Sequence, residues 1–351
     1  MQHDARVLIV DDSLMMRALF NGVLEGAKGI RVVGLAASAV EARRMIVDLR
    51  PNVITLDVEM PGTNGLQFLE EIMGSEHPLP VIMLSALTQR GADTSFKALE
   101  LGAVDCFPKP TAATSEEFEK LKALVRAAAN HGARPARYAT GLPDRVHHHT
   151  PHVVYDWNGK IILLSASTGG VDAMLQILPA FPANCPPTVI CLGIDPSLVG
   201  PLLTRLRGAC SAKVVLAEDG QALQQGVIQL VTDPAAHAVI DRWPNPAIGL
   251  RRSDPITGAR PSASLLFATA AKTAGANAVA AVLTGLGTDG AAGLRALKAA
   301  GGCTLAQDEA TSVVGEAPAA AKAAGAIERA LPLGEIAGVL LEQCRQVSKA
   351  A

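Results

Sequence analysis

Short apolar runs alternate with amphipathic segments along the first third of the chain. In the amphipathic segments, apolar residues recur three or four positions apart, which is typical of helices that bury one face. This alternation predicts βα units and a parallel sheet covered by helices on both faces. The predicted strands are 7–10, 32–36, 53–57, 81–85 and 103–107, and the predicted helices are 14–24, 39–49, 94–101 and 115–129.

The same alternation returns in the second half of the chain. A strand at 161–166 leads through a Gly-Gly turn into a helix at 171–178. Between the halves, the apolar period is lost in a stretch rich in Gly, Pro, Arg and His, which is typical of a linker. We therefore predict two doubly wound α/β domains at 1–126 and 160–346, joined by a linker over 127–159. Further strands are predicted at 188–192, 213–217, 228–232, 278–284 and 303–306.

Composition narrows the class of protein. Of 351 residues, 49% are hydrophobic and only 18% are charged, so disorder of the whole chain is excluded. Aromatic residues make up only 3%, so the cores must consist mainly of Ala, Val, Leu and Ile. With 31 basic and 33 acidic side chains, the formal net charge of −2 argues against non-specific binding to nucleic acid or to an anionic membrane surface.

The cysteines and the lengths of the apolar runs indicate that the protein is located in the cytoplasm. The six cysteines form no CxxC pair and are too sparse for a disulfide scaffold, which predicts reduced thiols. No apolar run approaches the roughly 18 residues of a membrane span, and the polar start of the chain lacks the shape of a secretory signal. We expect a cytoplasmic monomer with no membrane insertion and no nucleic-acid partner.

Carboxylates follow two of the predicted strands in the first domain. Asp11 and Asp12 come directly after the first strand, and Asp57 ends the third. The carboxyl ends of parallel strands meet at one edge of a sheet, so these three side chains should lie together. Their mutual repulsion favours a divalent cation, and Mg²⁺ prefers such oxygen ligands. The sequence therefore predicts a Mg²⁺ site at this edge.

A hydroxyl and an ammonium group are expected at the same edge. Ser85 ends the fourth strand, and Lys109 follows the fifth within Phe-Pro-Lys-Pro. Both could bind the oxygens of a phosphoryl group carried by Asp57. As an alternative, the aspartates and the serine would only cap helices and the lysine would be a solvated turn residue. Five such groups in the right places favour a phosphorylation site.

These residues resemble the receiver domain of two-component response regulators, over about residues 5–125. The resemblance implies a flavodoxin-like parallel sheet and phosphorylation of Asp57 by a histidine kinase. It also implies Mg²⁺ held by Asp12, Asp57 and the main-chain carbonyl of Glu59, with Asp11 in the outer shell of ligands.

In the second domain, a strand–turn–helix segment reads Ser-Ala-Ser-Thr-Gly-Gly and contains Ser167, Thr168 and Gly169. A serine on such a turn faces the positive end of the helix dipole, and adjacent backbone N–H groups can receive an oxyanion. The glycines let a substrate approach the backbone. The segment predicts a nucleophile, although a Ser or Thr that only caps the following helix is an alternative.

A second strand–turn–helix segment, Leu-Thr-Gly-Leu-Gly-Thr-Asp-Gly, offers another interpretation. Gly285, Gly287 and Gly290 form a GxGxxG pattern, and Asp308 follows at about the distance of a ribose-binding carboxylate. This pattern is the fingerprint of a dinucleotide-binding enzyme. Asp289 argues against that function, because its carboxylate would face the pyrophosphate from inside the turn.

Together, the receiver and these motifs resemble the chemotaxis protein-glutamate methylesterase family (CheB) over nearly the whole chain. The family hydrolyses methyl esters of glutamate on chemotaxis receptors and deamidates certain receptor glutamines. Further matching segments are Ala-Glu-Asp-Gly at 217–220, Arg-Pro-Ser at 260–262 and Asn-Ala-Val at 277–279.

For the second domain, the resemblance implies Ser167 as the nucleophile and Asp289 as the carboxylate that orients the base. Thr168 and Gly169 would form the oxyanion site, and no cofactor is expected in this domain. The expected partners are the cytoplasmic part of methyl-accepting receptors and a chemotaxis-type histidine kinase. An unphosphorylated receiver would cover the esterase site, and phosphorylated Asp57 would shift the population towards an uncovered state.

One position departs from the family pattern. The catalytic base of the family is a His just after the strand predicted at 188–192, shortly before a Pro that corresponds to Pro196. Ile194 occupies its place, and isoleucine cannot accept a proton. Of the eight histidines, only His237 lies inside the second domain, so it and the linker histidines are the candidates for a substitute base. Ser264 also replaces the Asp that usually follows Arg-Pro-Ser.

The sequence thus predicts a phosphorylation-regulated protein-glutamate methylesterase and protein-glutamine glutaminase. The alternative is a phosphorylation-switched pseudoenzyme that binds receptor or kinase without efficient hydrolysis. Ile194 favours the alternative, whereas Ser167, Asp289 and the glycine turns favour catalysis.

Overall fold

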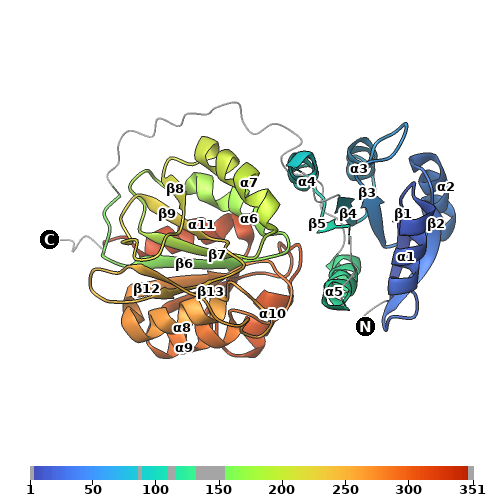
Figure 1. Cartoon of the computed structure of the whole chain (residues 1–351). Helices are drawn as coiled ribbons and strands as arrows, with labels where there is room; N and C mark the ends of the chain where they lie inside the picture. The colour runs from blue at the N-terminus through green and yellow to red at the C-terminus, as the bar shows by residue number, and fades with distance from the viewer. Residues whose placement is uncertain (1–3, 86–88, 110–114, 132–154, 347–351) are drawn as a thin grey trace. The chain divides into compact units, whose positions relative to one another are not determined.

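The chain divides into two α/β units, Met1–Val146 and His147–Ala351 (Figure 1). The computed structural model describes residues 4–85, 89–109, 115–131 and 155–346. Most of the expected linker, with its run of three adjacent histidines, lies outside the described residues.

The first unit contains a five-stranded parallel sheet. Its strand order is β2-β1-β3-β4-β5, which is the order of doubly wound folds of the flavodoxin type. β3 and β4 are buried at every residue, and apolar side chains accordingly occupy most of their positions. The strands are β1 (Ala5–Val10), β2 (Ile30–Ala36), β3 (Val53–Asp57), β4 (Val81–Ser85) and β5 (Asp105–Pro108).

Helices in this unit begin shortly after strands and are capped by short polar side chains. Ser13, Ser38 and Asn64 each accept a hydrogen bond from a first-turn N–H, of α1, α2 and α3 respectively. β2 lies on one side of β1 and the other strands lie on the opposite side, so right-handed crossovers place α1 on the face opposite to α2, α3 and α4. The helices are α1 (Leu14–Leu24), α2 (Ala39–Leu49), α3 (Gly65–Met73), α4 (Gln89–Glu100) and α5 (Ser115–His131).

The second unit is built on a seven-stranded parallel sheet with the order β14-β13-β12-β6-β7-β9-β8. β6 is buried at every residue and pairs with β12 on one side and with β7 on the other. β10 and β11 form a separate antiparallel pair. The strands are β6 (Ile161–Ala166), β7 (Thr188–Leu192), β8 (Lys213–Leu216), β9 (Val227–Val231), β10 (His237–Ile240), β11 (Ile248–Arg251), β12 (Ala278–Val282), β13 (Cys303–Gln307) and β14 (Arg329–Leu331).

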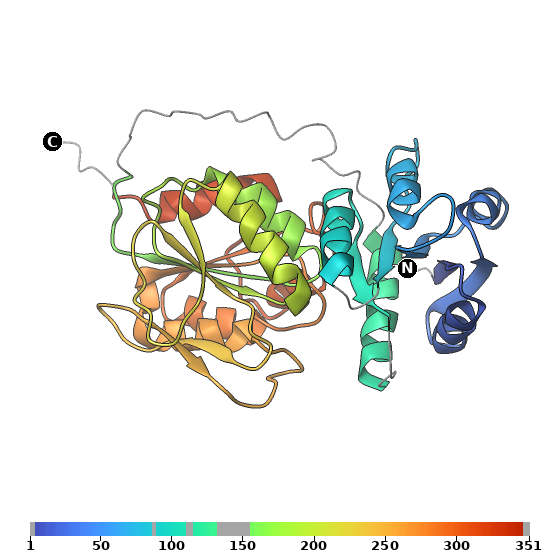
Figure 2. The same ribbon diagram turned by 45° about the horizontal axis from the view of Figure 1, so that its top comes forward.

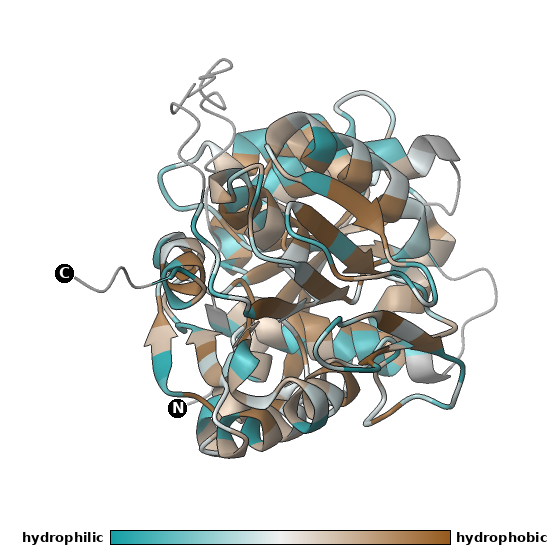
Figure 3. Ribbon diagram, turned by 90° about the vertical axis from the view of Figure 1, so that its left-hand side faces the viewer, coloured by the Kyte–Doolittle hydropathy of each residue, from teal (hydrophilic) through white to brown (hydrophobic). Residues whose placement is uncertain are grey.

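Helices cover both faces of this second sheet. α6, α7 and α11 lie on one face, and α8, α9 and α10 lie on the other (Figures 1 and 2). Figure 3 shows that the central strands are mostly hydrophobic, and buried Leu163, Leu266 and Phe267 belong to the core on the α8 side. The helices are α6 (Gly170–Ile177), α7 (Pro196–Ala209), α8 (Ala263–Thr273), α9 (Ala291–Ala299), α10 (Glu316–Ala323) and α11 (Leu333–Gln343).

The predicted fold class of two doubly wound α/β domains is confirmed, while the element limits differ in places. α5 continues to His131, past residue 126, and Tyr155 already belongs to the second unit, where its N–H bonds Asn184 Oδ1 and its hydroxyl bonds Leu341 O. The sequence does not predict β10, β11 and β14, because strands of three or four residues are too short to show a period.

All six cysteines are free thiols. Burial raises the pKa of Cys185 and of Cys210 to about 12, so both stay protonated and unreactive at neutral pH. Within the described part of the chain, no helix has both the length and the apolar character needed to cross a bilayer.

Candidate functional site

The sheet of the first unit changes its winding direction between β1 and β3. β1 pairs with both β2 and β3, so α1 and α3 leave this point on opposite faces of the sheet. Asp11 and Asp12 directly follow β1, and Asp57 is the last residue of β3. Open parallel sheets bind their ligands in the crevice that such a switch point creates.

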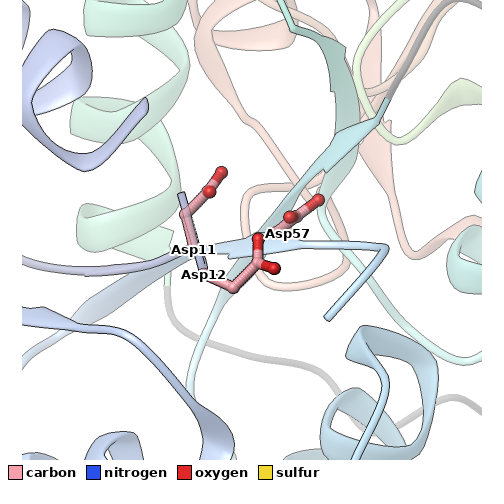
Figure 4. A group of neighbouring side chains, drawn as sticks. All are labelled: Asp11, Asp12 and Asp57. Carbon is pink, nitrogen blue, oxygen red and sulfur yellow. The ribbon is translucent and has the colours of Figure 1, made fainter. Parts of the chain in front are cut away.

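The three carboxylates converge at this crevice, as predicted (Figure 4). One oxygen from each of Asp11, Asp12 and Asp57 lies within 4.8 Å of the others. Asp11 and Asp57 are buried, whereas Asp12 is exposed. The N–H of Ser13 donates to Asp11 Oδ1 at 2.9 Å, and that of Glu59 donates to Asp57 Oδ1 at 3.1 Å. These bonds fix the orientation of the two buried carboxylates.

Lys109 bridges the two buried carboxylates. Its Nζ lies 2.8 Å from Asp11 Oδ2 and 2.7 Å from Asp57 Oδ2. Burial alone would lower the pKa of Lys109, but the hydrogen bonds to both carboxylates outweigh burial and hold this pKa above its ordinary value. Burial also raises the pKa of the Asp57 carboxyl, with Lys109 opposing that shift. The ammonium group therefore stays charged beside Asp57.

Ser85 reaches the same edge through the pairing of β4 with β5. It lies opposite Pro108 in the sheet, and its carbonyl accepts a hydrogen bond of 2.8 Å from the Lys109 N–H. Ser85 is buried, and β4 is the neighbour of the strand that ends at Asp57. A pocket of about 530 Å³ opens beside the carboxylates and is lined by Asp12, Val58, Glu59, Met60, Pro61, Asn64, Leu66 and Thr94.

The donor set suits a divalent cation. Three carboxylates and one ammonium group give the pocket a formal charge of −2, which one Mg²⁺ would neutralise. Asp11, Asp12 and Asp57 offer the oxygen ligands that this ion prefers. The Glu59 side chain is exposed and lies outside the carboxylate cluster, so only its main-chain carbonyl could contribute.

The sheet of the second unit has its own switch point, between β6 and β12. β7, β9 and β8 lie on one side of β6, and β12, β13 and β14 lie on the other. α6 and α9 therefore leave these strands on opposite faces, as Figure 1 shows. The turns after β6, β7 and β12 meet at this edge, where the candidate residues of the second domain are located.

Backbone hydrogen bonds join these three turns around Ser167. The Ser167 N–H donates to Thr284 O at 3.1 Å, and the Gly193 N–H donates to Ala166 O at 2.9 Å. The Leu286 N–H donates to Ser167 Oγ at 3.2 Å. The serine hydroxyl is therefore held at the switch point by a backbone donor from the turn after β12.

The residue type of Leu286 gives no sign of this contact, because its contribution is a backbone N–H. A Cβ atom on the preceding Gly285 would clash with Ser167 Oγ, so only glycine leaves room for the hydroxyl. Gly287, on the other side, has a φ of +79°, which side-chain-bearing residues rarely adopt. The two glycines were the only sequence signal for a close backbone approach at this turn.

The turn after Ser167 presents free amide groups. Gly169 has a φ of +77°, and a Cβ there would lie 2.5 Å from Val313 Cβ. Gly169 is itself the N-cap of α6 and no side chain caps this helix, so the interpretation of a capping Ser or Thr is wrong. Within the described residues, the N–H groups of Thr168 and Gly169 have no hydrogen-bond acceptor, as expected of groups that receive a ligand oxygen.

Asp289 binds the beginning of α8. Its carboxylate accepts from Ser262 Oγ at 2.8 Å and from the Ala263 N–H at 2.6 Å. It also accepts from the Ser264 N–H at 3.1 Å, while Ser264 Oγ accepts from the Gly290 N–H at 2.8 Å. Three of its roughly four acceptor positions are filled, which leaves one for a further donor.

Ile194 is half-buried in the turn after β7. A Cβ on the preceding Gly193 would lie 3.2 Å from Ser167 Cβ. The following Asp195 caps α7, because its Oδ1 accepts from the Ser197 N–H at 2.9 Å. The backbone of this turn therefore passes close to the candidate nucleophile at Gly193, and the next residue along the chain is the apolar Ile194.

His237 has a structural role on β10. It is buried, its Nδ1 accepts from the Ser262 N–H at 3.1 Å, and its Nε2 lies 3.1 Å from Asp254 O. These contacts place the ring proton on Nε2 and leave no nitrogen free, which argues against His237 as a substitute base. His147, His148, His149 and His152, the linker candidates, lie outside the described residues.

The glycine turn after β12 is also a poor dinucleotide site. A pyrophosphate would need the amides of Leu286 and Gly287, but these already donate to Ser167 Oγ and to Glu316 Oε2. The alternative of a nicotinamide-dependent enzyme is therefore not favoured by the contacts of this turn.

Comparison with known proteins agrees with this geometry. The family model for the response regulator receiver domain matches residues 7–121, and the model for CheB methylesterase matches residues 162–340. The chain is 44% identical, over 344 residues and 96% of both chains, to the protein-glutamate methylesterase/protein-glutamine glutaminase of Agrobacterium fabrum. It is 40% identical, over 342 residues and 96% of both chains, to protein-glutamate methylesterase/protein-glutamine glutaminase 2 of Pseudomonas aeruginosa.

A solved structure supports the assignment of the second unit. The CheB methylesterase catalytic domain of Thermotoga maritima matches 52% of this chain and 98% of its own, with 30% identity and a TM-score of 0.50. The fold and the two sites thus define a response regulator with a methylesterase-type output domain. The chain belongs to the CheB family of protein-glutamate methylesterases/protein-glutamine glutaminases. None of these matches supports the alternative of a non-hydrolytic binding protein.

The contacts of Asp289 predict a measurable effect on stability. In Asp289→Ala, three donors at the beginning of α8 lose their acceptor, so we expect the free energy of unfolding of the second unit to fall by about 2–4 kcal/mol. Both tryptophans, Trp157 and Trp243, lie in this unit, so urea unfolding followed by tryptophan fluorescence reports on it alone. Asp156→Ala, at an exposed position, is the control, and equal losses in the two variants would refute the capping role.

Proposed function

We propose that this chain is a phosphorylation-regulated protein-glutamate methylesterase and protein-glutamine glutaminase that acts on methyl-accepting chemotaxis receptors. The observation that carries the proposal is a serine hydroxyl held by the Leu286 N–H at the switch point of the second sheet. The proposal draws further support from relatives with these activities, which match over 96% of the chain.

In the proposed reaction, Ser167 Oγ attacks the side-chain carbonyl carbon of a methylated glutamate or of a glutamine. The free N–H groups of Thr168 and Gly169 would receive the oxyanion, and the Leu286 N–H would join them once Oγ moves towards the substrate. Donors that are already in place cost no reorganisation when the charge develops. Asp289 would hold α8 and the turn after β12 in position, and its remaining acceptor site could orient a base.

In the first unit, Asp57 is the proposed acceptor of a phosphoryl group from a chemotaxis-type histidine kinase. Asp11, Asp12 and Asp57 would hold Mg²⁺ together with the Glu59 carbonyl, and the ion would supply positive charge for the phosphoryl oxygens. Lys109 and Ser85 would bind the same oxygens from the neighbouring strands. Six free thiols support action in the cytoplasm, on the cytoplasmic part of the receptors.

The activity can be tested through the methanol that ester hydrolysis releases. Incubation of the full chain with membranes that carry methylated receptors should release methanol, and Ser167→Ala should abolish the release because no nucleophile remains. Ser211→Ala, at an exposed position before β8, is the matched control and should keep the wild-type rate. Undiminished release by Ser167→Ala would contradict the proposed nucleophile, and no release by the wild type would contradict the proposed function.

The phosphorylation site makes a separate prediction. With acetyl phosphate and Mg²⁺, the wild type should gain one phosphoryl group in its intact mass, while Asp57→Asn should gain none. Chelation of the metal should prevent labelling, because the pocket then keeps its uncompensated charge of −2. Asp93→Asn, at an exposed position on α4, controls for unspecific labelling. Equal labelling of wild type and Asp57→Asn would refute the assignment.

The isoleucine at position 194 leads us to expect that a histidine there would speed up ester hydrolysis. Since Ile194 cannot accept the proton of Ser167, we expect slow hydrolysis by the wild type and at least about tenfold faster methanol release by Ile194→His. A positioned general base typically contributes about 10²–10⁴-fold, and the open acceptor position of Asp289 could orient the new imidazole. An unchanged rate would show that a histidine at this position does not reach Ser167.

A further inference from the structure

The turn after β12 binds two side-chain oxygens through consecutive backbone amides. The Leu286 N–H donates to Ser167 Oγ at 3.2 Å, and the Gly287 N–H donates to Glu316 Oε2 at 2.9 Å. The positive φ of Gly287, +79°, is typical of turns in which successive N–H groups form a concave site for anions. The hydroxyl of the proposed nucleophile and a carboxylate thus occupy adjacent positions on one turn.

The backbone fixes Glu316 at this place. The Gly285 N–H donates to Val314 O at 2.8 Å, and the Ala317 N–H donates back to Gly285 O at 3.0 Å. These bonds hold the first residues of α10 against the turn that contacts Ser167. The Glu316 residue is itself exposed, so its side chain has room to rotate between the Gly287 amide and the hydroxyl.

The other acid–base groups next to these turns are already engaged. Asp289 accepts three hydrogen bonds from the beginning of α8, and Asp195 caps α7. Both ring nitrogens of His237 are bonded. Glu316, by contrast, accepts a single hydrogen bond within the described residues. Among these groups it has the most acceptor capacity left for a proton.

We propose that Glu316 is the general base of Ser167 in this chain, in the place of the histidine that Ile194 replaces. The inference rests on the proposed esterase function and adds the identity of the proton acceptor. A carboxylate can act as a general base directly or through one water molecule. Ser167 Oγ and the Glu316 carboxylate accept from consecutive amides of one turn, so a rotation of the Glu316 side chain would carry its carboxylate towards the hydroxyl.

The proton balance closes over both half-reactions. Glu316 takes the proton of Ser167 as Oγ bonds to the ester carbonyl carbon, and it returns this proton to the methoxide oxygen when the C–O bond breaks, which yields methanol and an acyl-serine. It then takes a proton from water as the water oxygen attacks the acyl carbon. That proton returns to Ser167 Oγ as it leaves, so ester and water give carboxylic acid and methanol.

The decisive variant is Glu316→Gln. Glutamine keeps an oxygen that can accept from the Gly287 N–H, so the turn should keep its geometry, but an amide cannot act as a base. With methylated receptors as substrate, we expect kcat for methanol release to fall about 10²-fold or more, with KM nearly unchanged. Glu335→Gln is the matched control, because Glu335 is also an exposed residue in the first turn of a helix, α11.

The same change in the Ile194→His background separates the possible roles of Glu316. A histidine base should make Glu316 dispensable, so Glu316→Gln should then cost less than about threefold. Once Ile194→His has raised the rate, an equal loss in both backgrounds would identify a positioning role and overturn the proposal. An unchanged rate of Glu316→Gln in the wild-type background would also overturn the proposal. A faster rate would overturn it as well, and would identify Glu316 as an anion that blocks the site. In each of these cases, methanol release that depends on Ser167 would still support the proposed esterase function. If the wild type releases no methanol, both the esterase function and the role of Glu316 are overturned.

Discussion

Both candidate sites depend on one topological constraint, the reversal of winding direction in a parallel sheet. In the first unit the reversal lies between β1 and β3, and in the second it lies between β6 and β12. At each reversal, two helices leave on opposite faces, and the turns at the strand ends are left facing a crevice. Asp11 and Asp57 lie at one of these crevices, and Ser167 and Leu286 lie at the other.

The two crevices contain groups that favour ligands of opposite charge. The first collects three carboxylates and one ammonium group, so it attracts a cation and, with that cation, a phosphoryl group. The second collects backbone N–H groups from the turns after β6 and β12, and such donors suit the oxyanion of the proposed reaction. Glu316 is the exception, because it brings a negative charge to the second crevice. A proton acceptor next to Ser167 accounts for a charge that would otherwise disfavour the oxyanion.

The residues that end strands could be predicted from the sequence, because strand ends can be located from local patterns. This holds for the convergence of Asp11, Asp12 and Asp57 and for the joint placement of Ser85 and Lys109. Contacts between distant turns could not be predicted in this way. Leu286 donates through its backbone N–H to a serine 119 positions away, and Glu316 accepts from an amide 29 positions away. The glycines of the turn indicate a close approach, but no sequence pattern identifies the partner in either contact, because each contact depends on how separate turns meet in space.

His237 shows that a residue type can suggest a chemical role that its surroundings exclude. His237 is the only histidine within residues 160–346, but β10 buries it, its Nδ1 accepts from the Ser262 N–H at the beginning of α8, and its Nε2 contacts Asp254 O. Ser262 also donates through its hydroxyl to Asp289, so the beginning of α8 links these two residues. The sequence alone does not reveal this network. Identification of a base therefore needs the free acceptor capacity of each candidate as well as its residue type.

In the proposed function the two units form one regulated enzyme, in which phosphorylation of Asp57 controls hydrolysis at Ser167. The most direct test measures methanol release from methylated receptors with and without acetyl phosphate and Mg²⁺, for the wild type and for Asp57→Asn. We expect the phosphoryl donor to raise the rate of methanol release by the wild type and to leave that of Asp57→Asn at the basal level. Equal rates with and without donor in the wild type, or the same increase in Asp57→Asn, would contradict it.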